Sequence, residues 1–166
     1  MLNPDQLIEL ADEICQLGGV GAPRQVNLRR AASTAYYAVF HVLLGTIAET
    51  FVSANQRKAR ALFYRAVEHR ATRDRCKKLR QDPLPQAERS FFRFDAFPVE
   101  LRLFANNFVR LQEHRHSCDY DPDFRTTRDQ TRDMIETARD AIASIRTVSD
   151  EFKVPFLSYL LFGFRG

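Results

Sequence analysis

The sequence predicts an all-α protein: a single-domain antiparallel helical bundle of about five helices plus a short C-terminal apolar segment. Apolar residues recur at helical spacing through most of the 166 residues, and no convincing pair of strands appears. A hydrophobic content of 45% and a charged content of 28% are typical of a chain that buries one core. We expect residues 1–150 to form the bundle and residues 151–166 to pack on it or on a partner.

The first helix is predicted from its start and stop signals. Asn3 is a candidate N-cap, and Pro4 occupies the first helical position, where proline is favoured. Apolar residues then recur on one face until Gly18 and Gly19, which we expect to end the helix.

The second helix is expected at residues 25–51 and in the centre of the protein. Its middle is apolar or small on most faces, which is typical of a helix that several neighbours touch. We expect Tyr36 and Tyr37 to be core aromatics and His41 to be a hydrogen-bonded core histidine. The alternative is that one of these three side chains borders a cleft.

Three further helices are predicted before the C-terminal segment. The third covers residues 55–79, and a break near Ala71 is one alternative. A Phe-rich loop at 91–97 leads to a fourth helix that starts near Pro98. Thr127 opens a capping box for the fifth helix, whose apolar residues form a seam for packing against another helix.

Composition argues against several classes of protein. No apolar run approaches the roughly 20 residues of a membrane span, and the N-terminal residues lack the regions of a signal peptide. Three cysteines, far apart in the sequence, favour free thiols over a disulfide framework. We therefore expect a cytoplasmic protein with no membrane segment.

Positive charge is concentrated between Arg57 and Arg80, where ten Lys/Arg residues face only Glu68 and Asp74. Such a run is either a solvated helix face or an electrostatic footprint for nucleic acid or an acidic partner protein. The run by itself does not distinguish these interpretations.

A cluster of arginines and histidines closes the fourth predicted helix, from Arg110 to Tyr120. Arg115 follows Leu111 by four residues and therefore lies on the apolar face. An arginine there must reach solvent, pair with an acid or line a cleft. Asp119, four residues further on, could pair with it structurally. The alternative is a site for phosphate, and RNA phosphate fits best.

RNA cleavage is the chemistry that this cluster suits. The RNA 2′-OH is a built-in nucleophile, so the protein has to supply only proton transfer and charge stabilisation. His116 can move the proton, while Arg110 and Arg115 can hold the phosphorane oxygens. His114 and Asp119 are candidate supporting residues.

Metal-dependent and nucleophilic centres fit the same segment less well. His114, His116, Cys118 and Asp119 are possible ligands, but positions i and i+2 do not face each other on a helix. No second cluster supplies the remaining ligands. Ser117 and Cys118 lack the strand–turn–helix elbow of a catalytic nucleophile. We therefore expect no metal and no cofactor.

Two segments carry a resemblance to a known family. Residues 29–41, RRAASTAYYAVFH, resemble the second-helix signature of HEPN domains, which are small helical proteins of prokaryotic defence and toxin–antitoxin systems. Residues 115–122, RHSCDYDP, resemble the end of the fourth helix of these domains. The order of five helices also agrees, and the resemblance spans roughly residues 5–148.

The resemblance implies a homodimer in which the fourth helices bring two copies of the motif into one cleft. Family members include metal-independent ribonuclease toxins, which a nucleotidyltransferase-type antitoxin partner often neutralises. The resemblance thus implies an endoribonuclease toxin. The alternative is a non-catalytic HEPN protein that binds nucleic acid, a nucleotide or a nucleotidyltransferase partner.

The family's catalytic pattern is an arginine, often a polar residue, and a histidine four to six residues after the arginine. Two registers are open in this sequence. Arg115 followed by His116 fits the start, but Tyr120 stands at the histidine position. Arg110 with His116 fits the spacing, but Leu111 occupies the polar position. The candidate catalytic residues are therefore Arg110, Arg115, His116 and Tyr120.

Overall fold

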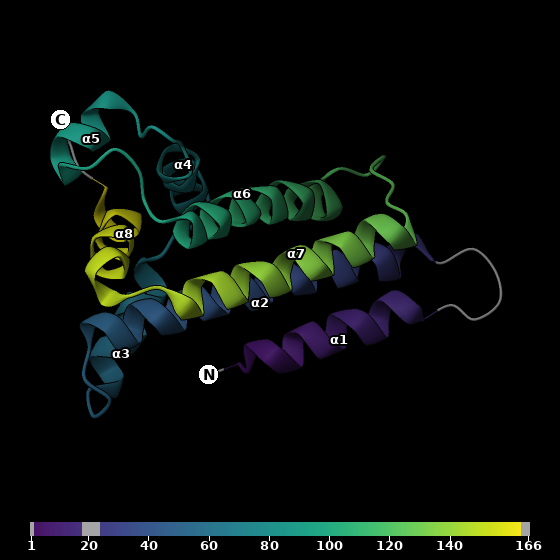
Figure 1. Cartoon of the computed structure of the whole chain (residues 1–166). Coiled ribbons are helices and arrows are strands. Elements are labelled where there is room, and N and C mark those ends of the chain that lie inside the picture. The colour runs from purple at the N-terminus through teal and green to yellow at the C-terminus, as the bar shows by residue number, and fades with distance from the viewer. Residues whose placement is uncertain (1, 18–23, 164–166) are drawn as a thin grey trace.

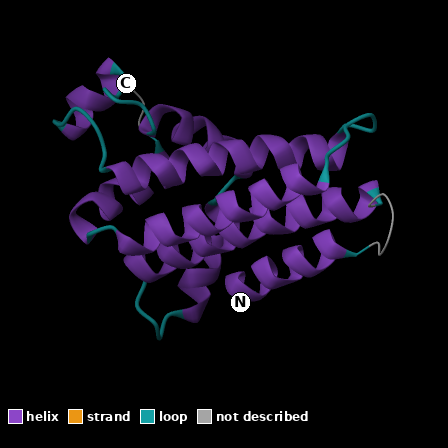
Figure 2. Ribbon diagram, turned by 45° about the vertical axis from the view of Figure 1, so that its right-hand side comes forward, coloured by secondary structure: helices purple, strands orange, loops and turns teal. Residues whose placement is uncertain are grey.

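The computed structural model of the chain describes residues 2–17 and 24–163, and all regular secondary structure in these ranges is helical (Figures 1 and 2). The helices in chain order are α1 (Pro4–Gln16), α2 (Gln25–Phe51), α3 (Arg57–Ala66), α4 (His69–Leu79), α5 (Gln86–Phe92), α6 (Val99–Tyr120), α7 (Arg128–Thr147) and α8 (Asp150–Phe162). The prediction of an all-α protein is confirmed.

The expected count of about five helices is wrong: one predicted helix is divided in two, and two segments that were not counted among the five are helical. Residues 55–79 form α3 and α4, and the break falls at the extended residues Val67 and Glu68 rather than near Ala71. The buried side chain of Val67 turns the chain back toward the core at this point. The Phe-rich segment contributes the end of α5, and the C-terminal apolar segment forms α8.

Local capping signals start two of the long helices as expected. The Asn3 side-chain oxygen accepts a hydrogen bond of 3.0 Å from the backbone N–H of Asp5. Thr127 and Gln130 form the reciprocal capping box, with distances of 2.9 and 3.1 Å. The α1 helix ends at Gln16. The two glycines predicted to end it lie outside the described residues.

The four long helices α1, α2, α6 and α7 lie side by side and alternate in direction in chain order, so that the neighbours α2 and α7 run parallel (Figure 1). The α2 helix packs against each of the other three, and 16 of its 27 residues are buried. This confirms the expected central position of α2. The other helices, α3, α4, α5 and α8, gather at one end of these four, where α4 packs on α6 and α8.

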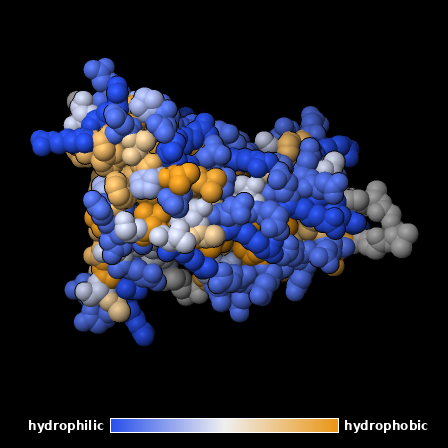
Figure 3. Space-filling view, in the orientation of Figure 1, coloured by the Kyte–Doolittle hydropathy of each residue, from blue (hydrophilic) through white to orange (hydrophobic). Residues whose placement is uncertain are grey.

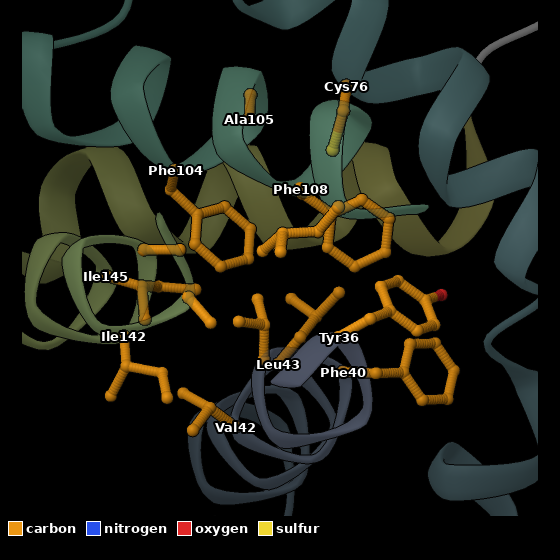
Figure 4. Packing of buried hydrophobic residues seen from close by; sticks show 14 of the residues in the cluster. Tyr36, Phe40, Val42, Leu43, Cys76, Phe104, Ala105, Phe108, Ile142 and Ile145 are labelled. Carbon is orange, nitrogen blue, oxygen red and sulfur yellow. The ribbon is translucent and has the colours of Figure 1, made fainter. Parts of the chain in front are cut away.

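Aromatic residues of α6 fill the space between α2 and α7. Figure 4 shows Phe104 and Phe108 pointing toward Leu43 of α2 and Ile145 of α7. Both phenylalanines are fully buried. The α8 helix joins the same core through Phe156, whose ring centroid lies 6.1 Å from that of Phe104. In this structure the C-terminal segment therefore packs on its own chain.

The α2 helix is long and apolar enough to cross a membrane by length and composition alone. However, 83% of its most apolar window is buried inside the protein, as in the core helix of a folded domain. Length and composition are therefore weak evidence for a membrane span here.

The α6 helix provides a matched test of the core. We expect Phe104→Ala to lower the free energy of unfolding by about 3–5 kcal/mol, because it removes a fully buried ring and leaves a cavity. Leu103→Ala on the same helix is the control, since Leu103 is 43% exposed, and should cost at most about 0.5 kcal/mol. Urea denaturation measures both, and equal losses would contradict this placement of the core.

Candidate functional site

The end of α6 meets α2 at Arg115, whose side chain is only 12% exposed. Its Nε lies 2.7 Å from Oδ2 of Asp119, and its Nη2 donates a 2.6 Å hydrogen bond to the hydroxyl of Tyr37. The surrounding residues from both helices are named here the Arg115 cluster: Ser33, Tyr36, Tyr37, Arg115, Asp119 and Tyr120. The structural pair between Arg115 and Asp119 that the sequence left open is therefore formed.

The carboxylate of Asp119 is held on both oxygens. Oδ2 contacts Arg115, and Oδ1 accepts a 2.7 Å hydrogen bond from the hydroxyl of Ser33 on α2. A carboxylate fixed in this way orients the guanidinium that it pairs with. Nη1 of Arg115 has no hydrogen-bond partner among the described residues, so one edge of the guanidinium remains for a ligand.

Three tyrosine rings surround the same guanidinium. The Arg115 Cζ atom lies 5.3 Å from the ring centroid of Tyr37, 5.4 Å from that of Tyr120 and 5.9 Å from that of Tyr36. These distances are within the range of cation–π attraction. Burial lowers the pKa of Arg115, but the hydrogen bond to Tyr37 and the charge of Asp119 outweigh it and raise the pKa overall. Arg115 therefore keeps its positive charge.

The sequence-predicted residues His116 and Tyr120 lie at the exposed edge of the cluster. Their ring centroids are 5.0 Å apart, and Tyr120 is 64% exposed. Because Tyr120 also lies over Arg115, an exposed imidazole, a phenol and a buried guanidinium are neighbours. These three groups are the part of the predicted site that the structure brings together.

Arg110 is not part of this group. It forms an ion pair with Asp133 of α7, and its Nη1 donates a 3.0 Å hydrogen bond to the hydroxyl of Thr137. His114 lies on the same side, against the ring of Phe124, and both line a separate pocket of about 430 Å³. Within one chain, Arg110 and Arg115 therefore act on different surfaces of α6.

A polar pocket of about 460 Å³ lies beside the cluster, lined by Arg29, Arg30, Ser33, Tyr37 and Asp119 among others. Arg29 has a structural task there, because its Nε and Nη2 bind the backbone oxygens of Cys118 and Asp121 at 2.6 and 2.8 Å. These contacts satisfy carbonyls at the end of α6. Arg30 is exposed and makes no ion pair or side-chain hydrogen bond to any described residue. The pocket therefore offers positive charge to an anion.

His69 of α4 is a neighbour of the cluster that the sequence did not indicate, because it lies in a basic run without a distinctive pattern. Its Nδ1 lies 2.5 Å from the hydroxyl of Tyr36, and its ring stacks on Phe40 at 4.0 Å. Burial raises the pKa of Tyr36, so the phenol keeps its proton. Burial, Arg115 and His41 all lower the pKa of His69. The hydrogen bond therefore joins two neutral groups, and the tautomer of His69 decides which of them donates.

The expectations for the second-helix aromatics divide. Tyr36 is fully buried, which confirms it as a core residue. Tyr37 instead lines the polar pocket, as the alternative allowed. We expected His41 to be hydrogen-bonded, but its Nδ1 is buried and has no hydrogen-bond partner among the described residues, so the expectation is wrong for this nitrogen.

The candidate metal ligands do not converge in the structure. In residues 2–17 and 24–163, no three His, Cys, Asp or Glu side chains come together as a potential metal site. Cys118 is a buried free thiol, and burial raises its pKa to about 11. A thiol with this pKa is a weak nucleophile at neutral pH.

The lowered pKa of His69 predicts a pH-dependent stability. In the unfolded chain a histidine binds its proton near pH 6.5. Folding lowers this pKa, so the stabilisation is complete above that pH and is lost as pH falls through the folded-state value. We expect His69→Gln to flatten the fall in unfolding free energy between about pH 7 and pH 5. The exposed His116→Gln is the control and should follow the wild type in urea titrations. Parallel profiles for wild type and His69→Gln would contradict the burial of this imidazole.

Comparison with known proteins adds no assignment to this geometry. A scan against protein-family models found no match. Neither a curated protein nor a solved structure matched the chain. The function therefore has to be inferred from the Arg115 cluster itself.

Proposed function

We propose that the protein is a HEPN-like, metal-independent endoribonuclease that acts from the Arg115 cluster, as the cytoplasmic toxin of a toxin–antitoxin or defence system. One observation carries the proposal. The two segments that resemble HEPN motifs, 29–41 and 115–122, form a single network through Ser33, Asp119, Arg115 and Tyr37. Such a network positions a charged side chain near the surface before any ligand arrives.

The proposed reaction uses the 2′-OH of RNA as its nucleophile. His116 accepts the hydroxyl proton as the oxygen attacks the adjacent phosphorus, and the bond from phosphorus to the 5′-oxygen breaks. A water molecule gives the leaving 5′-oxygen its proton, and the resulting hydroxide takes the proton from His116. The products are a 2′,3′-cyclic phosphate and a 5′-OH end. Arg115 stabilises the negative charge on the phosphorane, and Arg30 adds positive charge at the pocket. Tyr120 is assigned to binding, because a phenol is a poor base at neutral pH.

A second candidate function also has a specific observation in its favour. Arg115 is already paired with Asp119 and hydrogen-bonded to Tyr37, which leaves few donors for a transition state. The same cluster would then serve a non-catalytic HEPN protein that binds nucleic acid, a nucleotide or a nucleotidyltransferase-type antitoxin. In that case the network is a clamp between α2 and α6.

Cleavage assays distinguish the two candidates. In EDTA, the purified protein should cut RNA, leave 2′,3′-cyclic phosphate ends and spare DNA of the same sequence. We expect Arg115→Ala and His116→Ala each to lower the rate by roughly 100-fold or more. Arg132→Ala is the control, because Arg132 is a 58% exposed surface residue of α7 away from the cluster, and it should match the wild type.

Two further variants test the registers. Tyr120→Phe should slow cleavage only if the hydroxyl of Tyr120 has the role that the catalytic histidine has in the HEPN pattern. Arg110→Ala should have a small effect in a single chain, and a loss equal to that of Arg115→Ala would require a second chain to bring Arg110 to the cluster. Wild-type protein that binds RNA but never cleaves it would refute the nuclease and leave the binding module.

We further propose that the protein is a homodimer with two copies of the cluster in one cleft. Arg30, His116 and Tyr120 are exposed in the single chain and could border such a cleft. Light scattering at micromolar concentration should give twice 19.2 kDa, or about 38 kDa. A monomer at that concentration would contradict the shared cleft without affecting the fold.

A further inference from the structure

The positive charges between Arg57 and Arg80 differ in what they contact. Those on α4 mostly have partners: Arg73 pairs with Asp74, Lys77 with Glu113 and Lys78 with Glu88, Arg75 binds carbonyls of α8, and Arg80 binds Asn106. Four others have no ion pair or side-chain hydrogen bond to any described residue: Arg57, Lys58, Arg65 and Arg70. Uncompensated charge is therefore concentrated on α3 and the start of α4.

The α3 helix also carries a surface hollow of about 530 Å³, named here the α3 hollow, lined by Ala54, Arg57, Arg60, Ala61, Tyr64 and Arg65. Five of these residues, all except Ala54, belong to α3 and recur at helical spacing, so they share one face of that helix. The α3 helix projects from the end of the long helices, and that corner of the surface is largely hydrophilic (Figures 1 and 3). The hollow is therefore open to a ligand from solvent.

The walls of the α3 hollow combine three kinds of group. Two alanines contribute small apolar surface, and Tyr64 contributes a half-buried ring. Arg60 is fixed, because its Nε and Nη2 donate to the backbone oxygen of Val52 at 3.3 and 3.0 Å. Burial and nearby Glu49 raise the pKa of Tyr64, so the phenol stays neutral. The hollow is thus lined by three arginines and no acidic residue.

We infer that the α3 hollow binds one nucleotide of single-stranded RNA, at a site separate from the Arg115 cluster. Guanidinium groups of Arg57 and Arg65 suit a phosphate, and the ring of Tyr64 suits a base stacked beside it. The volume lies within the range of about 300–1,000 Å³ for small-ligand sites. The inference rests on the proposed function only in taking RNA as the ligand.

Continuity with the Arg115 cluster favours RNA over an acidic peptide. The α4 helix follows α3 after a short break, and its first residue, His69, is bonded to Tyr36 of the cluster. Arg65 and Arg70, both without an ion pair to a described residue, flank His69 along the chain. An RNA strand leaving the cluster therefore meets unpaired positive charge on the way to α3, and its bases can stack on the ring of Tyr64.

The test uses a fluorescein-labelled 2′-O-methyl oligouridylate of about 12 nucleotides, which spans such a path and lacks the 2′-OH needed for cleavage. Fluorescence anisotropy gives its Kd over a range of salt concentrations. We expect Arg57→Gln with Arg65→Gln to weaken binding about tenfold and to reduce the salt slope by about 0.7, for one lost phosphate contact. Tyr64→Leu should weaken binding roughly 5-fold to 150-fold.

The matched control is Arg73→Gln with Lys77→Gln, which removes the same charge from the same basic run, but at two side chains that are already paired. This control should stay within twofold of the wild type, and circular dichroism melting checks that every variant folds. Equal weakening by both double variants would overturn the site in favour of general charge attraction. Tight binding of poly-glutamate, at the expense of the RNA probe, would overturn it in favour of an acidic peptide.

The outcome is separable from that of the proposed nuclease. Arg115→Ala that loses cleavage but keeps the effect of the α3 variants on probe binding supports both sites. Wild-type protein that shows the α3 effect but cuts no RNA refutes the nuclease and retains the α3 site. Loss of the α3 effect with cleavage intact refutes the α3 site alone.

Discussion

A helix that is apolar on nearly every face has to be covered on nearly every side, and this constraint organises the protein. The α2 helix contacts α1, α6 and α7, and most of its residues are buried. Small residues such as Ala31, Ala35 and Ala38 let these neighbours approach closely. Because α1, α6 and α7 all pack on α2, the position of α2 is fixed. Its few polar side chains are therefore held in a defined place relative to α6.

The polar positions of α2 are used to hold one charge. Burying a guanidinium is costly unless it is paired and hydrogen-bonded. Asp119 of α6 pairs with Arg115, Tyr37 of α2 accepts a hydrogen bond from it, and Ser33 of α2 holds the carboxylate of Asp119 in place. The cluster is therefore a consequence of the packing of α2 on α6. The contacts that stabilise the arginine also orient it, so the same geometry suits either of the two proposed roles, clamp or catalytic group.

Charge on the outside of the protein follows a different rule. On α4, packing against α6 and α8 brings acids and carbonyls within reach of the basic side chains. The α3 helix projects away from these partners, so its arginines have fewer groups to pair with. Within the same basic stretch of sequence, most basic side chains of α4 are therefore paired, whereas most of those on α3 are not. Electrostatic attraction for an RNA strand would be strongest where compensation is absent.

Local sequence signals determined the helical class, the caps at Asn3 and Thr127 and the central place of α2, because capping and apolar periodicity act over a few residues. The break at Val67 and the helix α8 depended on where apolar side chains found a core, which periodicity does not encode. The sequence also singled out Arg115, because a charge on an apolar stripe is unusual, Asp119 from its spacing to Arg115, and His116 and Tyr120 from the motif at 115–122. Only the tertiary structure decided that Arg110 faces α7, that Ser33 and Tyr37 join the cluster with His69 beside it, and which cations stay unpaired. These outcomes depend on contacts between residues far apart in the chain, and such contacts are set by helix packing rather than by spacing.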